Sequence, residues 1–281
     1  MNNIEQNKRN AKIYRIFCMV VVIILAIFFL FPLYWIIVTA VKPTTEVSVY
    51  PPTLWPSRFE WGNFANVLAD YPIMLWFRNT AIVAFVATII TIALNLLAGY
   101  AFAKYEFRFK GALFMVVLST LMIPRQVIMV PSFIIVSRLN LSNTFTGLIL
   151  PVCAEAFGLF MARQFIAEIP DSLLEAGRSD GCSELGLFTK IVLPNVRPLI
   201  SVLVIYTIRW RWNDFQWPLI VVSKQEMYTL QLGIKNISGF TAVNWTDVMC
   251  ASLIALIPVA IIFLIFQKQF VEGSVSSGIK G

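Results

Sequence analysis

The sequence contains no histidine among its 281 residues, so it lacks the side chain that most often serves as a catalytic base or metal ligand. Its four cysteines, Cys18, Cys153, Cys182 and Cys250, have no paired spacing, so neither a zinc site nor a disulfide framework is indicated. No G-x-x-x-x-G-K-S/T, H-E-x-x-H or G-x-S-x-G motif occurs. These absences predict a non-enzymatic protein that binds no cofactor and no metal of its own.

Charge is also scarce: charged residues make up 13% of the chain, whereas 58% of its residues are hydrophobic and its mean hydropathy is +0.77. No soluble domain of this size needs that much apolar surface, so the composition indicates a polytopic membrane protein. The first apolar run is longer than the core of a signal peptide and lacks a small-residue cleavage site, so we expect it to be retained. Transmembrane helices are predicted at 16–41, 79–103, 111–136, 146–164, 198–222 and 248–266. We therefore expect an all-α membrane protein with a polar segment at 1–15 and a single transmembrane domain at 16–281.

The distribution of basic residues predicts the orientation of these spans. If the N-terminus is cytoplasmic, the inner segments contain Lys8, Arg9, Lys12, Arg15, Lys104, Arg108, Lys110, Arg163, Arg178, Lys190, Arg197, Lys268 and Lys280. The outer segments then contain only Lys42, Arg58, Arg78, Arg138, Lys224 and Lys235. Because cytoplasmic loops carry the excess of Lys and Arg, both termini are expected in the cytoplasm. Topology thus accounts for the net charge of +7, and nucleic-acid binding is not indicated.

Residues 168–198 form a charged, glycine-punctuated segment between two apolar runs, EIPDSLLEAGRSDGCSELGLFTKIVLPNVRP. Its pattern is helix, turn, helix. Asp171 can cap the first helix, and Gly181 permits a sharp turn after it. Ser183 can begin a second helix, which Pro194 is expected to end. A helical elbow of this kind suits docking into a cleft on a partner.

Within this segment, Glu175-Ala176-Gly177, Gly181 and, after nine residues, Ile191-x-Leu193-Pro194 resemble the "EAA" loop of importer permeases powered by ATP-binding cassettes. The resemblance implies a cytoplasmic coupling helix seated on an ATPase, with coupling residues Glu175, Ala176, Gly177, Asp180, Gly181, Ile191, Leu193 and Pro194. Gly177 departs from the family's alanine, which lowers helix stability by about 1 kcal/mol. The alternative is an ordinary amphipathic loop between two membrane helices.

Three further segments resemble carbohydrate importers within that permease family. They are Trp212-Asn213-Asp214-Phe215-Gln216-Trp217-Pro218-Leu219, similar to a WNDFxWPL signature, the tail Gln269-Phe270-Val271-Glu272-Gly273 with Gly278-Ile279-Lys280-Gly281, and the loop segment Thr53-Leu54-Trp55-Pro56. The resemblance covers nearly the whole chain and is greatest to the second permease of maltose-type systems. It implies an ATP-driven, binding-protein-dependent importer of sugars, most simply oligosaccharides, in the bacterial cytoplasmic (inner) membrane.

The same resemblance implies the partners of the chain. They are a homologous second permease in a heterodimer, two ATPase subunits that hold ATP and magnesium, an extracytoplasmic solute-binding protein, the oligosaccharide and the lipid bilayer.

Polar side chains share one face of the fifth predicted span. At 100° per residue, Tyr206, Arg209, Asn213 and Gln216 fall on one stripe, with Trp212 beside it. Lipid does not tolerate such a stripe, so we expect it to line a wet substrate pathway. Amides there would bind sugar hydroxyls, and an aromatic ring would pack on the sugar. The alternative is that the amides join this permease to its partner by interhelical hydrogen bonds.

Prolines predict breaks in two of the spans. Pro218 cannot donate to the carbonyl oxygen of Asp214, so a kink is expected in the fifth span. Pro124 and Pro131 flank Arg125 in the third span, a pattern typical of a wet or moving segment.

Five charged side chains lie inside the predicted spans, namely Arg125, Glu155, Arg209, Arg211 and Asp214. An isolated charge in lipid is costly, so each must be paired or hydrated. The three-residue separation of Arg211 and Asp214 favours a local ion pair. One hypothesis is that Arg209 and Arg125 bind the carboxylate of a uronate-containing sugar, which adds Arg125 to the predicted substrate pathway. The alternative is that Glu155 and Asp214 neutralise the arginines as structural ion pairs.

Two other functions compete with sugar import. An importer permease of the same machinery for amino acids or peptides would carry the same coupling loop. An ion-coupled secondary carrier would use Glu155, Asp214 and the arginines as a relay, but it would not need the charged segment at 168–198.

Overall fold

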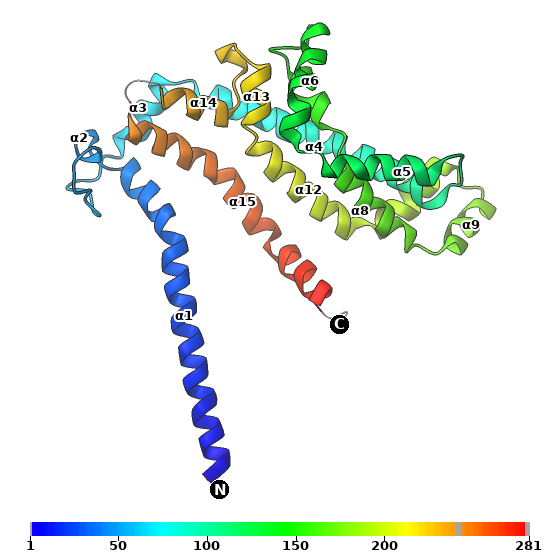
Figure 1. Cartoon of the computed structure of the whole chain (residues 1–281), viewed down its shortest axis with the longest axis horizontal. Coiled ribbons are helices and arrows are strands. Elements are labelled where there is room, and N and C mark those ends of the chain that lie inside the picture. The colour runs from blue at the N-terminus through cyan, green and yellow to red at the C-terminus, as the bar shows by residue number, and fades with distance from the viewer. Residues whose placement is uncertain (1, 240–242, 279–281) are drawn as a thin grey trace. The chain divides into compact units, whose positions relative to one another are not determined.

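The computed structural model describes residues 2–239 and 243–278, and it describes side chains over 10–239 and 243–265. Within these ranges every regular element is helical, which confirms the predicted all-α class (Figure 1). The helices are α1 (Asn2–Ala40), α2 (Thr44–Val47), α3 (Gly62–Asp70), α4 (Ile73–Lys104), α5 (Lys110–Ser119), α6 (Arg125–Arg138), α7 (Phe145–Ile149), α8 (Ala156–Ala167), α9 (Asp171–Ser179), α10 (Glu184–Leu187), α11 (Leu193–Asn195), α12 (Arg197–Trp212), α13 (Gln216–Val221), α14 (Leu230–Ile237) and α15 (Trp245–Gly278). Short 3₁₀ turns lie at Thr120–Met122, Leu150–Val152 and Gln225–Met227, and a π-helical turn lies at Phe188–Val192.

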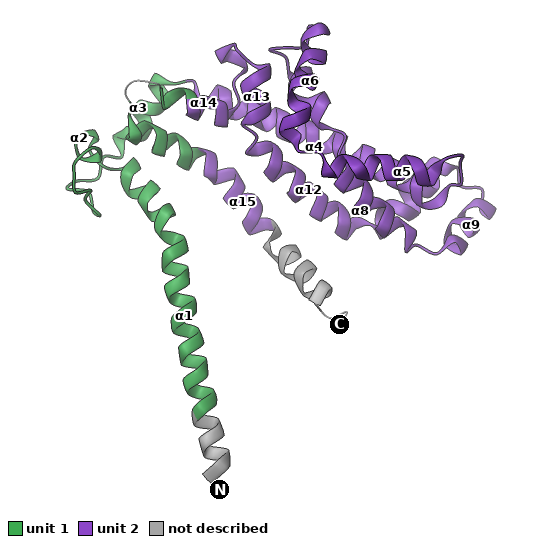
Figure 2. Ribbon diagram, viewed as in Figure 1, with its two compact units in different colours: residues 1–71, 236–254 green, residues 72–235, 255–281 purple. Residues whose placement is uncertain are grey.

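The chain divides into two compact units, which Figure 2 shows in different colours. The first unit comprises residues 1–71 and 236–254, and the second comprises residues 72–235 and 255–281. The transmembrane domain expected at 16–281 runs through both. Within the tail whose sequence resembles carbohydrate importers, Ile279, Lys280 and Gly281 lie outside the described residues.

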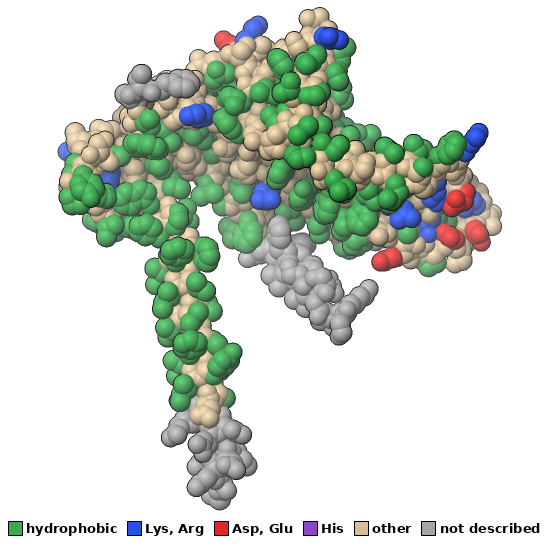
Figure 3. All heavy atoms as spheres, in the orientation of Figure 1, with side chains coloured by type: hydrophobic (Ala, Val, Ile, Leu, Met, Phe, Trp, Pro, Cys, Tyr) green, Lys and Arg blue, Asp and Glu red, His purple; other side chains and the backbone are tan. Residues whose placement is uncertain are grey.

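Three helices are long and apolar enough to cross a membrane alone, as far as the chain is described. They are α1, α4 and α15, which cover the predicted spans at 16–41, 79–103 and 248–266. Hydrophobic side chains cover α1 (Figure 3), and none of its most apolar stretch is buried by the protein itself. This helix therefore offers its apolar surface to lipid or to another subunit.

The other three predicted spans differ from the continuous helices expected. In place of 111–136 the chain forms α5 and α6, bent by 106°, and in place of 146–164 it forms α7 and α8, bent by 49°. In place of 198–222 it forms α12 and α13, with residues 213–215 between them. If each bent pair that passes the same test counts as one span, the described residues hold up to six candidate spans.

Proline explains two of these interruptions. Pro124 precedes α6 in an extended conformation (ψ 133°), as predicted for the third span. The kink predicted before Pro218 lies between Trp212 and Gln216. Pro131, by contrast, lies inside α6, which continues through it.

The core of the second unit is organised around α4, which packs against α8 and α12. A Cβ atom added to Gly99 of α4 would lie 2.5 Å from the Cβ of Ala162 and 2.9 Å from the backbone nitrogen of Arg163. Only glycine permits two helices to approach so closely. Buried apolar residues form one cluster of α4, α8, α12 and the segment 168–198, and a second cluster of α4, α6, α7 and α13.

Candidate functional site

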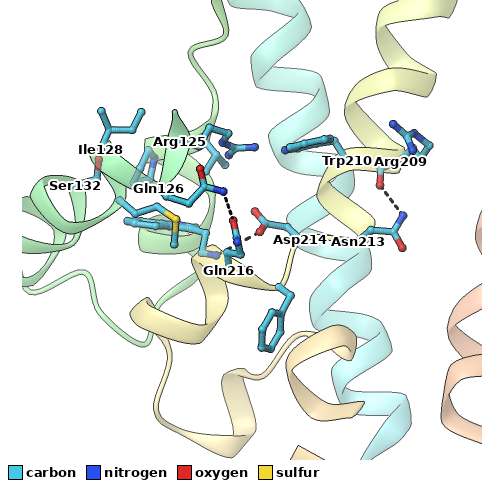
Figure 4. A pocket seen from close by; sticks show the side chains of 14 residues that line it. Arg125, Gln126, Ile128, Ser132, Arg209, Trp210, Asn213, Asp214 and Gln216 are labelled. Carbon is cyan, nitrogen blue, oxygen red and sulfur yellow. Dashed lines mark hydrogen bonds between the residues drawn. The ribbon is translucent and has the colours of Figure 1, made fainter. Parts of the chain in front are cut away.

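A cavity of about 580 Å³ lies in the second unit where the membrane helices are interrupted (Figure 4). The start of α6, the turn at Leu150–Val152, the end of α12 and the start of α13 form its wall. It is lined by Arg125, Gln126, Ile128, Met129, Ser132, Pro151, Val152, Arg209, Trp210, Asn213, Asp214, Phe215, Gln216 and Trp217. Non-helical backbone at membrane depth is tolerated where it lines such a polar cavity, and membrane transporters use interrupted helices to bind substrates.

One wall of the cavity presents an aromatic ring between two cationic groups. Trp210 is 41% exposed, and Tyr206 stacks on it with ring centroids 6.4 Å apart and planes 15° apart. The guanidinium of Arg125 lies 5.3 Å from the centroid of the Trp210 ring, a cation–π contact between α6 and α12. Figure 4 shows Trp210 between Arg125 and Arg209. A planar ring face with flanking guanidinium groups can hold a sugar ring that carries a carboxylate.

Side-chain amides complete the polar lining. The Nδ2 of Asn213 donates to the carbonyl oxygen of Arg209 at 2.8 Å. The Nε2 of Gln126 donates to the Oε1 of Gln216 at 3.4 Å, which joins α6 to α13. An amide has two N–H donors and two acceptor lone pairs, so each of these side chains has hydrogen-bonding capacity left for a ligand.

The buried ion pair near the cavity differs from the one expected. Arg211 is 3% exposed, and its Nη2 donates to the carboxylate of Glu155 and to the carbonyl oxygen of Val152. Asp214 instead accepts a hydrogen bond from the backbone nitrogen of Trp217 at 3.3 Å. The predicted Arg211–Asp214 pair is wrong because α12 ends at Trp212, so Asp214 leaves the helical face that Arg211 occupies. Glu155 does neutralise one arginine, Arg211, as predicted by the alternative in which these charges form structural ion pairs.

The remaining charges give the cavity an excess of positive charge. Its charged lining residues are Arg125, Arg209 and Asp214. The Glu155 carboxylate is taken up by Arg211, which leaves two guanidinium groups and one carboxylate facing the cavity. An anionic ligand is favoured in such a site because it balances the excess charge.

Four of the six predicted substrate-pathway residues line the cavity, and two do not. Arg125, Arg209, Asn213 and Gln216 all line the cavity. Tyr206 lies behind Trp210, against which it stacks. Trp212 is placed elsewhere: it is 2% exposed, and its Nε1 donates to the carbonyl oxygen of Ala255 at 3.0 Å.

Trp210 and Gln126 are among the lining residues that sequence reasoning missed. Trp210 lies next to Arg209 in the sequence but off the polar stripe. It lines the wall near the end of α12, where the polar stripe also stops. Gln126 comes from a distant part of the chain, and no local pattern signals its contact with Gln216.

The segment at 168–198 forms the helical elbow expected from its pattern, and we refer to it as the elbow. The Oγ of Ser183 caps α10 by accepting from the backbone nitrogen of Gly186 at 3.2 Å, and Gly181 has a φ of 81°. Asp171 is the first residue of α9 rather than its cap. Pro194 does not end the second helix, because it lies inside α11 and the chain turns by 80° only before α12.

An ion pair holds the elbow on the end of α4, and Figure 3 shows charged side chains gathered near α9. Lys104 Nζ lies 2.7 Å from the Oδ1 of Asp171, and this hydrogen bond with its charge lowers the pKa of the Asp171 carboxyl. Arg178 Nε lies 2.9 Å from the Oε1 of Glu184, and the other oxygen of this carboxylate, Oε2, accepts from the hydroxyl of Tyr105. These contacts fix the elbow to the end of α4.

The predicted coupling residues divide between the inside and the outside of the elbow. Glu175, Ala176, Asp180, Gly181 and Pro194 are exposed. Gly177 is buried, and Ile191 and Leu193 are partly buried against the core.

One exposed residue of the elbow escaped prediction. Leu185 of α10 is 68% exposed. With the exposed coupling residues it forms an uncovered surface suited to another protein.

Interrupted membrane helices around a polar cavity define a transport protein. The sequence profile described as "Binding-protein-dependent transport system inner membrane component" matches residues 95–273. The chain belongs to this family. The assignment supports an inner-membrane location and a non-catalytic role, and it sets aside the ion-coupled secondary carrier.

Individual relatives cover nearly the whole chain. The arabinooligosaccharides transport system permease protein AraQ of Bacillus subtilis is 32% identical over 272 residues, 96% of this chain and 97% of that protein. The sn-glycerol-3-phosphate transport system permease protein UgpE of Yersinia enterocolitica is 34% identical, over 93% of this chain and 96% of that protein. A bacterial ABC transporter involved in the import of the acidic polysaccharide alginate has the same fold. One of its chains superposes with a TM-score of 0.83 at 22% identity, over 92% of this chain and 97% of its own length.

Proposed function

We propose that the chain is the translocation subunit of an ATP-driven importer of oligosaccharides, and that these carry a carboxylate. The observation that carries the proposal is the aromatic wall of the cavity, where Trp210 lies between Arg125 and Arg209. The names of the relatives support both parts: two of the three systems described above import a sugar polymer, and two import an anionic substrate.

The chemistry of the cavity favours an acidic sugar over an amino acid or a peptide. A pyranose ring offers an apolar face to the indole of Trp210, and its hydroxyls match the amides of Asn213 and Gln216. A carboxylate binds guanidinium by paired charge-assisted hydrogen bonds, which neutral sugars cannot make. The lining holds only Asp214 as a carboxylate that would bind an ammonium group of an amino acid.

The elbow supports coupling to an ATPase. Its residues Glu175, Asp180 and Leu185 are exposed on a segment that an ion pair holds to α4. In this proposal two ATPase subunits, which hold ATP and magnesium, dock there in the cytoplasm, with both termini of this chain on the same side. A homologous permease completes the heterodimer, and an extracytoplasmic binding protein delivers the sugar.

The test is the ATPase activity of the complete reconstituted transporter with binding protein loaded with uronate oligosaccharides, neutral oligosaccharides or peptides. Uronates are expected to stimulate the ATPase. Arg209→Gln should reduce uronate transport about tenfold or more, since a hydrogen bond to a charged group contributes about 1.5–3 kcal/mol. Arg138→Gln, at the exposed end of α6 outside the cavity, is the matched control and should leave transport unchanged.

Stimulation by neutral sugars alone, or unchanged uronate transport in Arg209→Gln, would overturn the acidic-substrate assignment. Stimulation by peptides alone would overturn the sugar assignment.

A further inference from the structure

The first unit exposes large aromatic side chains in the loop between α2 and α3. Trp55, Phe59 and Trp61 are 64%, 48% and 65% exposed. Their rings contact one another: Trp55 and Phe59 meet edge to face with centroids 5.6 Å apart, and Phe59 stacks with Trp61 at 6.3 Å. We call these three residues the aromatic ladder. Rings that contact each other while remaining open to the outside form a surface rather than a core.

Hydrogen bonds hold this loop in place from both sides. The Nδ2 of Asn63 donates to the carbonyl oxygens of Ala40 and Lys42 at 3.0 and 2.9 Å. The backbone nitrogen of Glu60 donates to the carbonyl oxygen of Val41 at 2.8 Å. The ladder is therefore presented in a fixed position before it meets any partner.

The loop also folds back along α1. The hydroxyl of Tyr34 donates to the carbonyl oxygen of Leu54, the residue just before the ladder begins. At 1.5 Å per residue, Tyr34 lies about 9 Å before the end of α1 at Ala40. Leu54 is thus brought back beside a stretch of α1 rather than beyond its end.

That stretch of α1 lies near one end of its apolar run. The apolar run at 16–41 is longer than the roughly 20 residues needed to cross the hydrocarbon region, so its ends reach the headgroups. Tryptophan is enriched at this level because its ring is apolar and its N–H is polar. Arg58, which lies between Trp55 and Phe59 in the sequence, forms an ion pair with Glu60, and its side chain stays 75% exposed, so its outer face is open to lipid phosphates.

We propose that the aromatic ladder inserts into the lipid headgroup region and fixes the depth of α1 in the membrane. The ladder does this whatever the transporter carries, because none of its residues belongs to the cavity.

The test measures tryptophan fluorescence of the complete transporter in vesicles of phosphatidylethanolamine and phosphatidylglycerol, with a fraction of lipids brominated near the carbonyl end of the acyl chain. Trp55→Phe and Trp61→Phe keep an aromatic ring at each position, so folding is preserved. Each is expected to remove part of the quenched fluorescence, and lipids brominated near the methyl end are expected to quench these residues less. Trp210→Phe, in the cavity wall, is the matched control and should leave the amount of fluorescence lost to quenching unchanged.

Equal quenching in wild type and both ladder variants would overturn the proposal, since Trp55 and Trp61 would then lie outside the lipid. If addition of the binding protein shifts the fluorescence of these residues while brominated lipid does not quench it, the ladder is a protein-docking surface and the proposal fails. Stronger quenching from the methyl end of the chains would also overturn it, because the ladder would lie in the hydrocarbon core.

Discussion

The elbow and the cavity belong to the same compact unit, yet they use their polar side chains differently. In the elbow, charged groups are engaged with each other, as in the contacts of Lys104 with Asp171 and Arg178 with Glu184. In the cavity, Arg125 and Arg209 face open space with no carboxylate partner within ion-pair distance in the described structure. Charged side chains that form ion pairs within the protein stabilise its fold, whereas charged side chains without such a partner are available to bind a ligand.

The backbone shows the same contrast. The elbow is made of short helices packed on the core, with Leu174 and Leu187 at 1% and 0% exposure, and Ser183 caps the start of α10. The cavity is made where helices stop, at 120–124, 153–155 and 213–215. The packed elbow is suited to move as one body, and the interrupted helices of the cavity are suited to adjust around a ligand.

The largest effect is expected from Arg211→Met, which removes the buried support behind the cavity. It leaves the Glu155 carboxylate largely buried and unpaired, so the free energy of unfolding should fall by about 3–5 kcal/mol. Thermal unfolding of the purified protein measures the loss.

The double variant Arg211→Met with Glu155→Leu tests the cause of that loss. It should recover most of the stability, because no buried charge remains. If the double variant is as unstable as Arg211→Met, the ion pair is not the reason, and the cavity rests on Arg211 for packing alone.

A smaller effect is expected from Glu175→Ala on the outside of the elbow. The fold should be unchanged because the side chain is exposed, but the ATPase activity stimulated by loaded binding protein should fall about tenfold, equivalent to 1.4 kcal/mol of interface energy. Ser172→Ala, an exposed position on the same helix, is the control. Unchanged activity in Glu175→Ala would show that the exposed face of α9 does not couple to the ATPase.

The smallest effect is expected from Gly177→Ala, which restores the alanine of the permease family. Alanine favours a helix by about 1 kcal/mol, but the added Cβ would lie 2.6 Å from the Cδ2 of Leu187 and 2.8 Å from the Cδ1 of Ile191. These contacts are with flexible side-chain ends. The cost of crowding should therefore exceed the gain in helix propensity only slightly, and the free energy of unfolding should fall by less than about 1 kcal/mol. Gly111→Ala is the matched control, because a Cβ there meets nothing within 4 Å and should stabilise the chain. Equal stabilisation by both substitutions, measured as a shift in Tm, would contradict the crowding around Gly177.

The elbow was predictable because its signals are local. A helix cap at Ser183 and a turn at Gly181 depend on neighbours a few residues away, and the structure confirms both. The ties to α4 were not predictable, because the contact of Lys104 with Asp171 joins distant parts of the sequence. Gly177 shows the same limit: its departure from the family pattern was read as lost helix propensity, whereas its packing against Leu187 gives a structural reason for glycine.

The cavity was predicted only in part for a related reason. Helical spacing predicts one polar face from Arg209 to Gln216, but the chain leaves the helix after Trp212. Four of the predicted residues still reach the cavity, and after the break Gln216 points to Gln126 of α6 (Figure 4). The partner of Arg211 was misjudged because helical spacing cannot show Glu155, which comes from the neighbouring interrupted span.

Helix α4 contributes Ile92 and Leu96 to the cluster that holds the elbow, and Val83 and Ala87 to the cluster beside the cavity. Its 32 residues extend over roughly 48 Å without a break. Close-packed interiors transmit strain instead of absorbing it. Because one unbroken helix joins both clusters, we expect a displacement of the elbow to shift Val83 and Ala87 beside the cavity as well.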